Sequence, residues 1–269
     1  MSEPLLLLTN DDGVHAEGLR ALVEAVEPLG ELIVAAPEGE RSGTGHAMTF
    51  HSSLRAQQTA RGWWSVSGTP VDCIYFGLIH LCPRPPALVL SGINAGHNLG
   101  TDVFYSGTVG GAAEAYLRGV PAIAASVDRG VDPVWAGPIV RALAKAQLAD
   151  LAHPQLLNVN VPAAGEPRAT HDEIARASED REVVVTRLGR RDYHDAVEER
   201  VDPMGRSYYW IGGPPQHLHG HEGDDTWAIS RGLVSVTPLE LDLTAPDFSR
   251  AEALVRGAAE LRLGKDGHT

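Results

Sequence analysis

Short apolar runs alternate with amphipathic segments through the first 160 or so residues of this 269-residue chain. Runs that are apolar on both faces are typical of strands in a parallel sheet covered by helices. The segments between them carry helical patterns, so the repeat is βαβ. We therefore predict an α/β fold with a doubly wound, mostly parallel sheet. The apolar runs are LLLL (5–8), ELIVAAP (31–37), PALVLSG (86–92), PAIAASV (121–127) and LLNVNVP (156–162).

Helices are expected between these runs, and two of them have clear N-terminal signals. One begins with Thr69 as a cap and Pro70 at the first helical position, both typical of a helix start. In the helical pattern GGAAEAYLRG, either Ser106 or Thr108 can serve as the cap. The predicted helices lie at residues 16–29, 69–81, 110–119 and 134–151.

The pattern changes after Pro162. The segment from about residue 180 to 230 is rich in charges, glycines and histidines and has little periodicity. It is too small for a hydrophobic core of its own, so we predict an arm that packs on a partner subunit. The chain thus divides into a catalytic core, 1–162, and an extension, 163–269, that holds this arm, a returning strand and a terminal helix. Outside the βαβ repeat we expect strands at 48–55, 63–68, 183–187, 207–211 and 233–238 and a helix at 248–262.

The charge balance limits the partners of this chain. The chain has 35 acidic and 22 basic residues and therefore a net charge of −13. This negative charge argues against nucleic acid as a partner. Cys73 and Cys82 form no disulfide framework, which indicates a reducing compartment. The N-terminus lacks a signal peptide, and no apolar run reaches the ~20 residues that a membrane helix needs. We expect a cytoplasmic protein without a membrane partner.

Loops rich in small polar residues follow three of the apolar runs. TNDDG (9–13) follows the first, EGERSGTGH (38–46) the second, and a long loop over 91–111 the third. A turn at 128–133 is a weaker candidate. Ligands of parallel sheets bind outside the carboxyl ends of the strands. Ordinary βα loops have about 2–6 residues, so the third loop is unusually long and favours a functional role.

Two adjacent carboxylates in TNDDG, a turn expected to face solvent, suggest a bound cation. Neighbouring like charges repel each other, and a divalent ion would reverse that effect. The set of oxygen donors suits Mg²⁺ or Mn²⁺ better than Zn²⁺. Nitrogen could come only from His15, His46 and His97. The candidate oxygen donors are Asp11, Asp12, Ser42 and Asn94.

The turn SGTVGG (106–111) leads into a helix and presents hydroxyls and free backbone N–H groups. Such a helix start is a ready site for an anion. A hard cation beside a phosphate site indicates phosphoryl chemistry. An acidic chain also needs a local positive group, such as a metal ion or a helix N-terminus, to bind an anionic substrate.

Other motifs fail the tests for familiar sites. SGTGHAM has Met48 where a dinucleotide fingerprint needs a third glycine, and the Gly-Lys pair at 264–265 is followed by aspartate instead of Ser or Thr. NDDGV would put Asn10 at the nucleophile position of an aspartyl-phosphate phosphatase, and an amide cannot form the acyl phosphate. The run HLHGH (217–221) has three histidines at alternate positions, which could line one strand face and bind a metal, but an exposed polar loop is expected. A solvated face is expected for Arg187, Arg190 and Arg191.

Several separated motifs, in order, resemble one family. TNDDG, APEGERSGTGHAMT, GTPVDC and SGINAGHNLGTDVFYSGTVGGAAE are similar to the survival protein SurE, a family of metal-dependent 5'-nucleotidases. TRLGRRDY, DPMGRSYYWIGG and DDTWAISRGLVSVTPL extend the resemblance to about residue 240. Asp224 stands where the family usually has threonine, and Leu233 where it usually has tyrosine. These departures affect the expected C-terminal packing and subunit contacts.

The resemblance implies a Rossmann-like core, a C-terminal region that exchanges elements between subunits, and a homodimer or homotetramer. It also implies one divalent ion per subunit, Mg²⁺ or Mn²⁺. The implied metal ligands are Asp11, Asp12, Ser42 and Asn94. The implied phosphate-binding residues are Gly43, Asn98, Ser106, Gly107 and Thr108.

The expected activity is hydrolysis of nucleoside 5'-monophosphates to nucleoside and phosphate by direct attack of water. We assign catalytic roles to Asp12, which would orient or deprotonate the water, and to Ser42, which would hold the phosphoryl oxygens. His46 or His97 would protonate the leaving group. The alternatives are a broad-specificity phosphatase or exopolyphosphatase and a non-catalytic nucleotide-binding protein.

Overall fold

The computed structural model describes residues 3–163, 182–191, 197–211 and 220–258. By the contacts within the chain, these residues fall into two compact units, Met1–Leu239 and Glu240–Thr269. The first unit contains the sheet and the candidate site. The second contains helix α7 (Ser249–Gly257).

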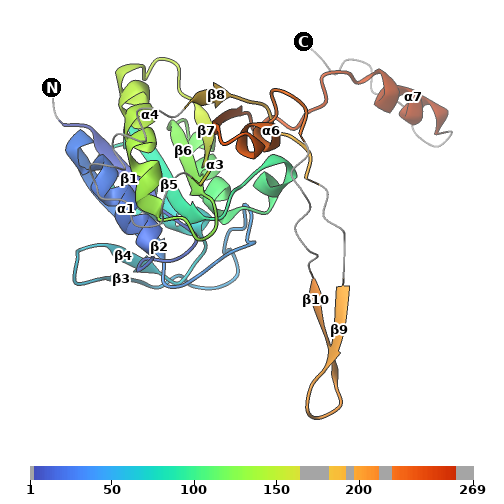
Figure 1. Ribbon diagram of the computed structural model, residues 1–269, viewed down its shortest axis with the longest axis horizontal. Helices are drawn as coiled ribbons and strands as arrows, with labels where there is room; N and C mark the ends of the chain where they lie inside the picture. Colours follow the sequence, from blue (N-terminus) through green and yellow to red (C-terminus); the bar gives the residue numbers. More distant parts are fainter. Residues whose placement is uncertain (1–2, 164–181, 192–196, 212–219, 259–269) are drawn as a thin grey trace. The chain divides into compact units, whose positions relative to one another are not determined.

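The first unit is built on a nine-stranded sheet with the strand order β3-β4-β2-β1-β5-β6-β7-β11-β8 (Figure 1). All neighbours from β4 to β7 are parallel, and β3 and β11 are antiparallel to β4 and β7. This arrangement confirms the predicted α/β class with a mostly parallel sheet. The strands are β1 (Leu5–Thr9), β2 (Glu31–Pro37), β3 (Ala56–Gln58), β4 (Trp64–Val66), β5 (Leu88–Ala95), β6 (Ala122–Val127), β7 (Leu156–Val161), β8 (Val183–Val185) and β11 (Val234–Leu239).

Helices cover both faces of the sheet. Helices α1 and α4 pack against each other on one face, and α2 and α3 pack against each other on the other (Figure 1). Short helical turns extend or precede several of them. The helices of this unit are α1 (Glu17–Val26), α2 (Pro70–Phe76), α3 (Gly107–Leu117), α4 (Gly137–Ala149) and α6 (Asp225–Ser230), and the turns are η1 (Glu27–Leu29), η2 (Gly77–Leu81), η3 (Gly100–Phe104) and η4 (Pro133–Ala136).

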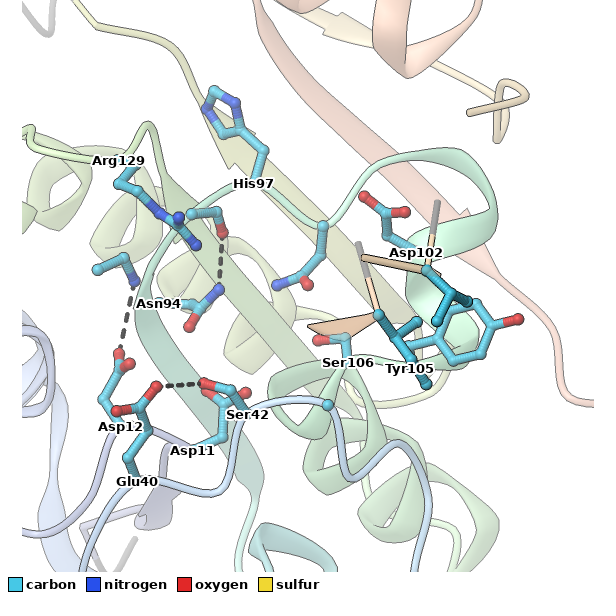
Figure 2. A pocket seen from close by; sticks show the side chains of 16 residues that line it. Asp11, Asp12, Glu40, Ser42, Asn94, His97, Asp102, Tyr105, Ser106 and Arg129 are labelled. Atoms are coloured by element: carbon cyan, nitrogen blue, oxygen red, sulfur yellow. Dashed lines mark hydrogen bonds between the residues drawn. The ribbon is translucent and has the colours of Figure 1, made fainter. Parts of the chain in front are cut away.

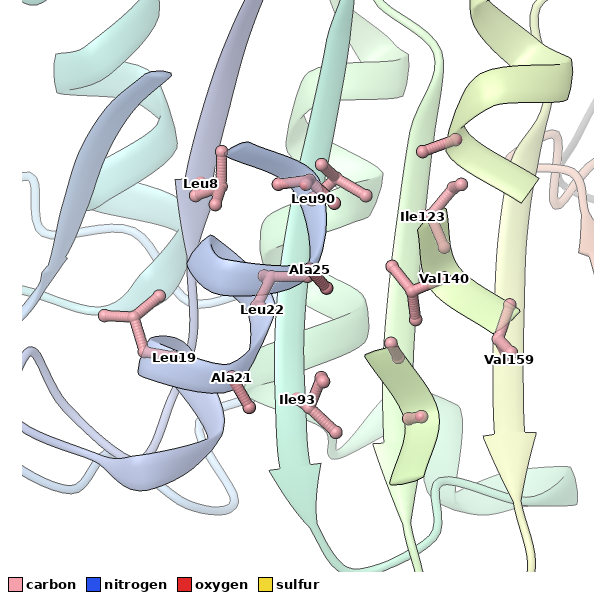
Figure 3. Packing of buried hydrophobic residues seen from close by; sticks show 14 of the residues in the cluster. Leu8, Leu19, Ala21, Leu22, Ala25, Leu90, Ile93, Ile123, Val140 and Val159 are labelled. Carbon is pink, nitrogen blue, oxygen red and sulfur yellow. The ribbon is translucent and has the colours of Figure 1, made fainter. Parts of the chain in front are cut away.

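The four leucines that begin β1 are buried on both faces of the sheet. Leu6 and Leu8 belong to the core cluster formed with α1 and α4, where Leu22 and Val140 also lie (Figure 3). Side chains alternate along a strand, so Leu7 points to the other face and packs beside Gly77 at the end of α2. This two-sided burial explains why the strand sequences are continuously apolar.

Local signals set the starts of two helices as predicted. The Thr69 hydroxyl accepts the Asp72 N–H at 3.1 Å, and the Asp72 carboxylate accepts the Thr69 N–H at 2.8 Å, which completes a capping box on α2. For α3 the cap is Ser106, whose hydroxyl accepts the Val109 N–H at 3.1 Å. Thr108 lies inside the helix and has another role.

The sequence-based expectations differ from the structure in several elements. No strand forms at 48–55, where the Asp72 carboxylate instead accepts the Thr49 N–H at 2.8 Å. Two elements lie outside the sequence-based expectations, the short helix α6 and the strand β9 (Val197–Val201). Each depends on packing or pairing with another element, which a local sequence pattern does not record. Strand β11 returns to pair with β7 of the predicted core, so the expected boundary at 162 falls inside the first unit. The division into catalytic core and exchange arm stays a prediction.

Within the predicted arm, β9 pairs antiparallel with β10 (Ser207–Ile211) in a separate two-stranded sheet. Every residue of the two strands is exposed. A two-stranded hairpin is marginally stable alone in water. Apolar side chains on both strands are left exposed in the single chain. The exposed apolar side chains are Val197, Val201, Tyr208, Tyr209, Trp210 and Ile211.

Three other expectations concern the C-terminal part. The histidine run 217–221 lies, apart from His221, outside the described residues. The arginines expected on a solvated face are partly engaged, since Arg187 pairs with Asp224 and Arg191 pairs with Asp102. In the part of the chain that the structure describes, no helix is long and apolar enough to cross a membrane.

Candidate functional site

The candidate site lies where the order of the strands reverses. From β1 the chain passes to β2 on one side, and β5 on the other side of β1 begins the series β5-β6-β7. The loops after β1 and β5 leave the same edge of the sheet in opposite directions, which opens the crevice where ligands of doubly wound sheets bind. Asp11 and Asp12 follow β1, and Asn94 lies at the end of β5.

The turn after β1 is closed by Asn10. Its side-chain Nδ2 donates to the Gly13 carbonyl at 3.0 Å, and its Oδ1 accepts the Gly13 N–H at 3.2 Å. Asn10 is fully buried, as is appropriate for a structural residue. The expectation that this turn faces solvent is wrong for Asp11, whose side chain is only 4% exposed.

Helix α3 begins behind Asp11. The Thr108 hydroxyl donates to Asp11 Oδ1, and a Cβ atom on Gly107 would lie 3.0 Å from the Asp11 Cβ. A side chain at position 107 would crowd the carboxylate, so glycine favours this close approach of the helix start. The positive end of the helix dipole favours a negative charge at this point.

Burial raises the pKa of Asp11 from 3.8 to about 6, against the hydrogen bond from Thr108, which lowers it. The neighbouring Asp12 carboxylate adds to the rise. Burial likewise raises the pKa of Asp12, and Glu40 contributes to that shift by repulsion. Ionising both aspartates therefore costs free energy that a cation between them would offset.

The loop after β2 carries Ser42 to the same place. The Arg41 N–H donates to the Asp11 carbonyl at 2.7 Å, which ties this loop to the first turn. The Ser42 hydroxyl donates to Glu40 Oε1 at 2.9 Å, so its lone pairs are left to accept or to bind a cation (Figure 2). Glu40 is a site residue that we missed; its place in the loop sequence carried no distinguishing signal.

Strand β5 presents Asn94 opposite the two aspartates. The Asn94 Nδ2 donates to the Gly96 carbonyl at 2.7 Å, which leaves the amide oxygen on the side of the carboxylates (Figure 2). The Ala95 N–H donates to Asp12 Oδ2 at 3.4 Å. The first turn and the loop after β5 are therefore joined at the point where the predicted donors meet.

Asn98 is held by polar side chains from two strands. Its backbone N–H donates to Asn160 Oδ1 at 2.8 Å, and its Nδ2 donates to the Ser126 hydroxyl at 2.8 Å. Asn158 Nδ2 donates to the Asn98 carbonyl at 2.8 Å. Asn158 and Asn160 both lie in the predicted apolar strand 156–162, where two amides in a buried run are the sequence signal of a polar role.

The two histidines proposed as general acids lie in different places. His97 lines the cavity, and its Nε2 lies 3.0 Å from the Val161 carbonyl. Burial lowers its pKa, so the neutral ring is favoured. His46 is not among the residues that line the cavity; its Nε2 lies 3.0 Å from Glu114 Oε2, and Glu114 also pairs with Arg118.

A cavity of about 1110 Å³ joins these groups. All four predicted metal ligands line it, as do the predicted phosphate-binding residues Gly43, Asn98 and Ser106. Gly107 and Thr108 do not line it and instead contact Asp11 from behind. Lining residues that the sequence did not single out are Glu40, Ala95, Gly96, Asp102, Tyr105, Arg129, Val197 and Ile211.

The donor set fits a hard divalent cation. Among the described residues, no three histidine, cysteine, aspartate or glutamate side chains gather in a metal-binding group. The candidate set is instead two carboxylates, Asp11 and Asp12, with the neutral oxygens of Ser42 and Asn94. Oxygen donors of this kind suit Mg²⁺ or Mn²⁺, and both ions keep several waters when they bind so few protein groups.

Comparison with known proteins agrees with the fold and with the motifs. A family model described as "Survival protein SurE" matches residues 6–195. The 5'-nucleotidase SurE of Geotalea uraniireducens (strain Rf4) is 44% identical over 255 residues, which cover 93% of this chain and 98% of that protein. The 5'-nucleotidase SurE of Pelotomaculum thermopropionicum is 43% identical over 258 residues, with 93% of each protein covered.

The same similarity holds in three dimensions. The crystal structure of the SurE protein from Aquifex aeolicus has a TM-score of 0.77 and 37% sequence identity to this chain, and the match covers 94% of this chain and 100% of the other. Because the family model spans more than half of the sequence and these relatives match nearly all of it, the chain belongs to the SurE family.

Proposed function

We propose that this protein is a divalent-metal-dependent phosphomonoesterase that hydrolyses nucleoside 5'-monophosphates to nucleoside and phosphate. The observation that carries the proposal is the pair of a buried Asp11 and a half-buried Asp12, both with raised pKa values, which line a cavity together with Ser106 at the N-terminus of α3. Relatives that match nearly the whole chain are named 5'-nucleotidases, which supports the same reaction.

The proposed cation is Mg²⁺ or Mn²⁺, one per subunit, held by Asp11, Asp12, Ser42 and Asn94. When bound, such an ion polarises a phosphoryl oxygen and makes a nearby water more acidic. Asp12 is the more exposed of the two carboxylates and is the one proposed to orient or deprotonate the attacking water. Thr108 supports the site by holding the Asp11 carboxylate.

The phosphoryl group of the substrate is proposed to lie near Ser106 and Asn98. Ser106 lines the cavity at the N-terminus of α3, an 11-residue helix whose dipole favours an anion. Asn98 is preorganised by its contacts with β6 and β7. Gly43 lines the cavity with a φ of +75°, a conformation that residues with side chains rarely adopt.

An aromatic side chain at the rim of the cavity favours a substrate that contains a nucleoside. Tyr105 lines the cavity and is 67% exposed. A flat ring in this position can stack on a nucleobase, which contributes affinity with little base preference. This feature favours a nucleotidase over the alternative of a phosphatase or exopolyphosphatase without a nucleoside site.

Of the two proposed general acids, the geometry favours His97 for contact with substrate, since it lines the cavity and His46 does not. Its lowered pKa favours the neutral ring, however, which has no proton to give at the free nitrogen if Nε2 donates to Val161. We therefore propose that His97 accepts a hydrogen bond or orients water, and that the leaving oxygen takes its proton from solvent.

We also propose that the protein is a homodimer or homotetramer in which the β9–β10 hairpin packs on a partner subunit. Its apolar side chains, among them Tyr209 and Trp210, are exposed in the single chain. Val197 and Ile211, at the base of the hairpin, line the cavity, so assembly and substrate binding would be linked.

The test of the proposed function is phosphate release from AMP and GMP, measured after chelation and after addition of Mn²⁺ or Mg²⁺. We expect activity only with the metal and a higher kcat/KM for AMP than for glycerol phosphate, with the Tyr105→Ala variant losing that preference. Equal rates on both substrates would support the broad phosphatase. Binding of AMP without turnover would support the non-catalytic alternative.

A further inference from the structure

Arg129 is the one lysine or arginine among the described residues that line the cavity. It lies in the turn after β6, which the sequence identified only as a weak candidate loop, and its side chain is exposed. Figure 2 shows it beside Asn94 and His97, on the wall opposite Tyr105 and Ser106.

The backbone holds this arginine next to the proposed metal ligand. The Gly96 N–H donates to the Val127 carbonyl at 3.0 Å, which joins the loop after β5 to the end of β6. The Arg129 N–H donates to Asp128 Oδ1 at 2.8 Å, which shapes the turn. A Cβ atom on Gly96 would lie 4.0 Å from Arg129 Nη2 and 4.0 Å from Asn94 Nδ2.

Gly96 is needed here for its backbone conformation. Its φ of +147° is one that residues with side chains rarely adopt. A Cβ atom at this position would meet the guanidinium and the amide only at ordinary van der Waals distance, so the conformation, and not a lack of space, calls for glycine. The backbone thus keeps the Arg129 side chain at the wall of the cavity, close to Asn94.

The charges of the cavity call for such a cation when substrate is bound. Four carboxylates line it, from Asp11, Asp12, Glu40 and Asp102. A divalent ion would neutralise the first two, and Arg191 pairs with Asp102. A phosphate monoester would add about two further negative charges next to Glu40. Among the described lining residues, Arg129 is the side chain that can offset them.

We propose that Arg129 binds a non-bridging oxygen of the substrate's phosphoryl group, so that the group is held between the guanidinium on one wall and Ser106 with the start of α3 on the other. The planar guanidinium presents paired N–H donors that match phosphate oxygens. This assignment rests on the proposed function and adds a specificity residue that selects dianionic phosphate over uncharged ligands.

The experiment compares Arg129→Gln and Arg129→Lys with the wild type and with Arg20→Gln. Arg20 is an exposed arginine on α1 that pairs with Glu17 and Glu24, so its replacement is matched in charge. Calorimetry measures the Kd of inorganic phosphate, adenosine and Mn²⁺, and steady-state kinetics measures kcat/KM for AMP.

We expect Arg129→Gln to weaken phosphate binding and to lower kcat/KM by about 10- to 100-fold, the loss typical of one charged hydrogen bond. Arg129→Lys should restore part of both, while adenosine and Mn²⁺ bind within about twofold of wild type. Arg20→Gln should change none of these values. Inhibition by phosphate should weaken in parallel with its Kd.

Two results would overturn the assignment. Unchanged phosphate affinity in Arg129→Gln would mean that the side chain is simply solvated. An equal loss for adenosine and Mn²⁺ would mean that Arg129 only supports the loop. If the wild type binds phosphate but does not hydrolyse AMP, the proposed function fails, and the phosphate Kd of the variants still decides the role of Arg129.

Discussion

Asp11 shows how one residue links the stability of the fold to the occupancy of the site. Its carboxylate is buried, touches the start of α3 and stands next to a second aspartate. In the folded chain its pKa is about 6 instead of 3.8, so the folded state binds this proton more tightly than the unfolded state does. The resulting stabilisation is complete below pH 3.8 and is lost as the pH rises through about 6.

The first prediction follows from the loss of this stabilisation as the pH rises. After chelation, Asp11→Asn should be more stable than wild type at pH 7.5, by on the order of 3 kcal/mol at most, and close to it at pH 4. The amide keeps an oxygen to accept the Thr108 hydroxyl. Urea unfolding at both pH values measures the difference, and comparing variant with wild type removes the contributions of other titrating groups.

The same variant should lose metal-dependent turnover and the rise in Tm that Mn²⁺ gives the wild type. Wild-type protein should gain more Tm from Mn²⁺ at pH 7.5 than at pH 5, because protons compete with the ion. A variant that retains near wild-type activity would remove Asp11 from the metal site. One that is less stable at pH 7.5 would contradict the electrostatic reading of the turn.

The second prediction concerns the nucleophile. Ser42 is the side chain that most resembles a covalent nucleophile, because its hydroxyl donates to Glu40. We nonetheless expect water to attack directly, since Ser42 is proposed to bind the cation. Hydrolysis of a chirally labelled phosphate ester should then invert the configuration at phosphorus, and Glu40→Gln should retain activity within roughly 10-fold. Net retention, with loss of activity in Glu40→Gln, would assign the attack to Ser42.

At the scale of elements, a hydrogen bond to Asp225 at the start of α6 connects the C-terminal segment to the loop at 91–111 of the candidate site. The Asp225 carboxylate is fully buried and accepts the N–H groups of Gly100 and Gly189, each at 2.8 Å. It also accepts the Thr226 N–H at 2.7 Å. The turn η3, which leads to Ser106, therefore depends on a residue more than a hundred positions later in the chain.

The third prediction is that Asp225→Asn lowers the free energy of unfolding by roughly 2–4 kcal/mol, because the amide turns an NH₂ group toward one of these donors and leaves it unsatisfied. Asp242→Asn is the matched control, since Asp242 is exposed and accepts the N–H of the nearby Thr244 at 2.8 Å. Urea denaturation measures both. Equal free energies of unfolding for the wild type and Asp225→Asn would show that the hydrogen bonds to Asp225 do not stabilise the loop.

At the scale of the whole molecule, the exposed β9–β10 hairpin is the proposed contact between subunits. Removal of everything after about residue 180 would be a poor test, because it would also remove β11, which pairs with β7 in the main sheet. A shorter deletion separates the two effects. The residues of β9 and β10 are all exposed in the single chain, so their loss should not open the core.

The fourth prediction is that replacing residues 198–210 with two glycines reduces the particle mass to that of a monomer and leaves the unfolding transition cooperative. Light scattering gives the mass and circular dichroism the transition. A double variant, Tyr209→Ser with Trp210→Ser, keeps the chain length and should weaken assembly in the same direction. An unchanged mass in both proteins would mean that the hairpin is not the subunit contact.

What the sequence determined by itself is mainly local. The apolar runs predicted five strands of the parallel sheet, because burial on both faces leaves a continuous pattern in the sequence. Thr69 predicted one helix start and the pair Ser106 and Thr108 another, because a cap bonds within three residues of itself; the structure selects Ser106. TNDDG and the loop at 91–111 pointed to one edge of the sheet, because parallel strands bring their carboxyl ends together.

The tertiary structure alone decided how distant residues share the site. Thr108, predicted to bind phosphate, lies beside Asp11 and donates its hydroxyl to that carboxylate, and His46 lies beside Glu114 and does not line the cavity. Arg129 reached the wall beside Asn94, and β11 joined β7 within the core. A sequence pattern records which groups a segment must bury or expose, whereas these contacts join segments whose mutual distance is set only when the sheet has formed.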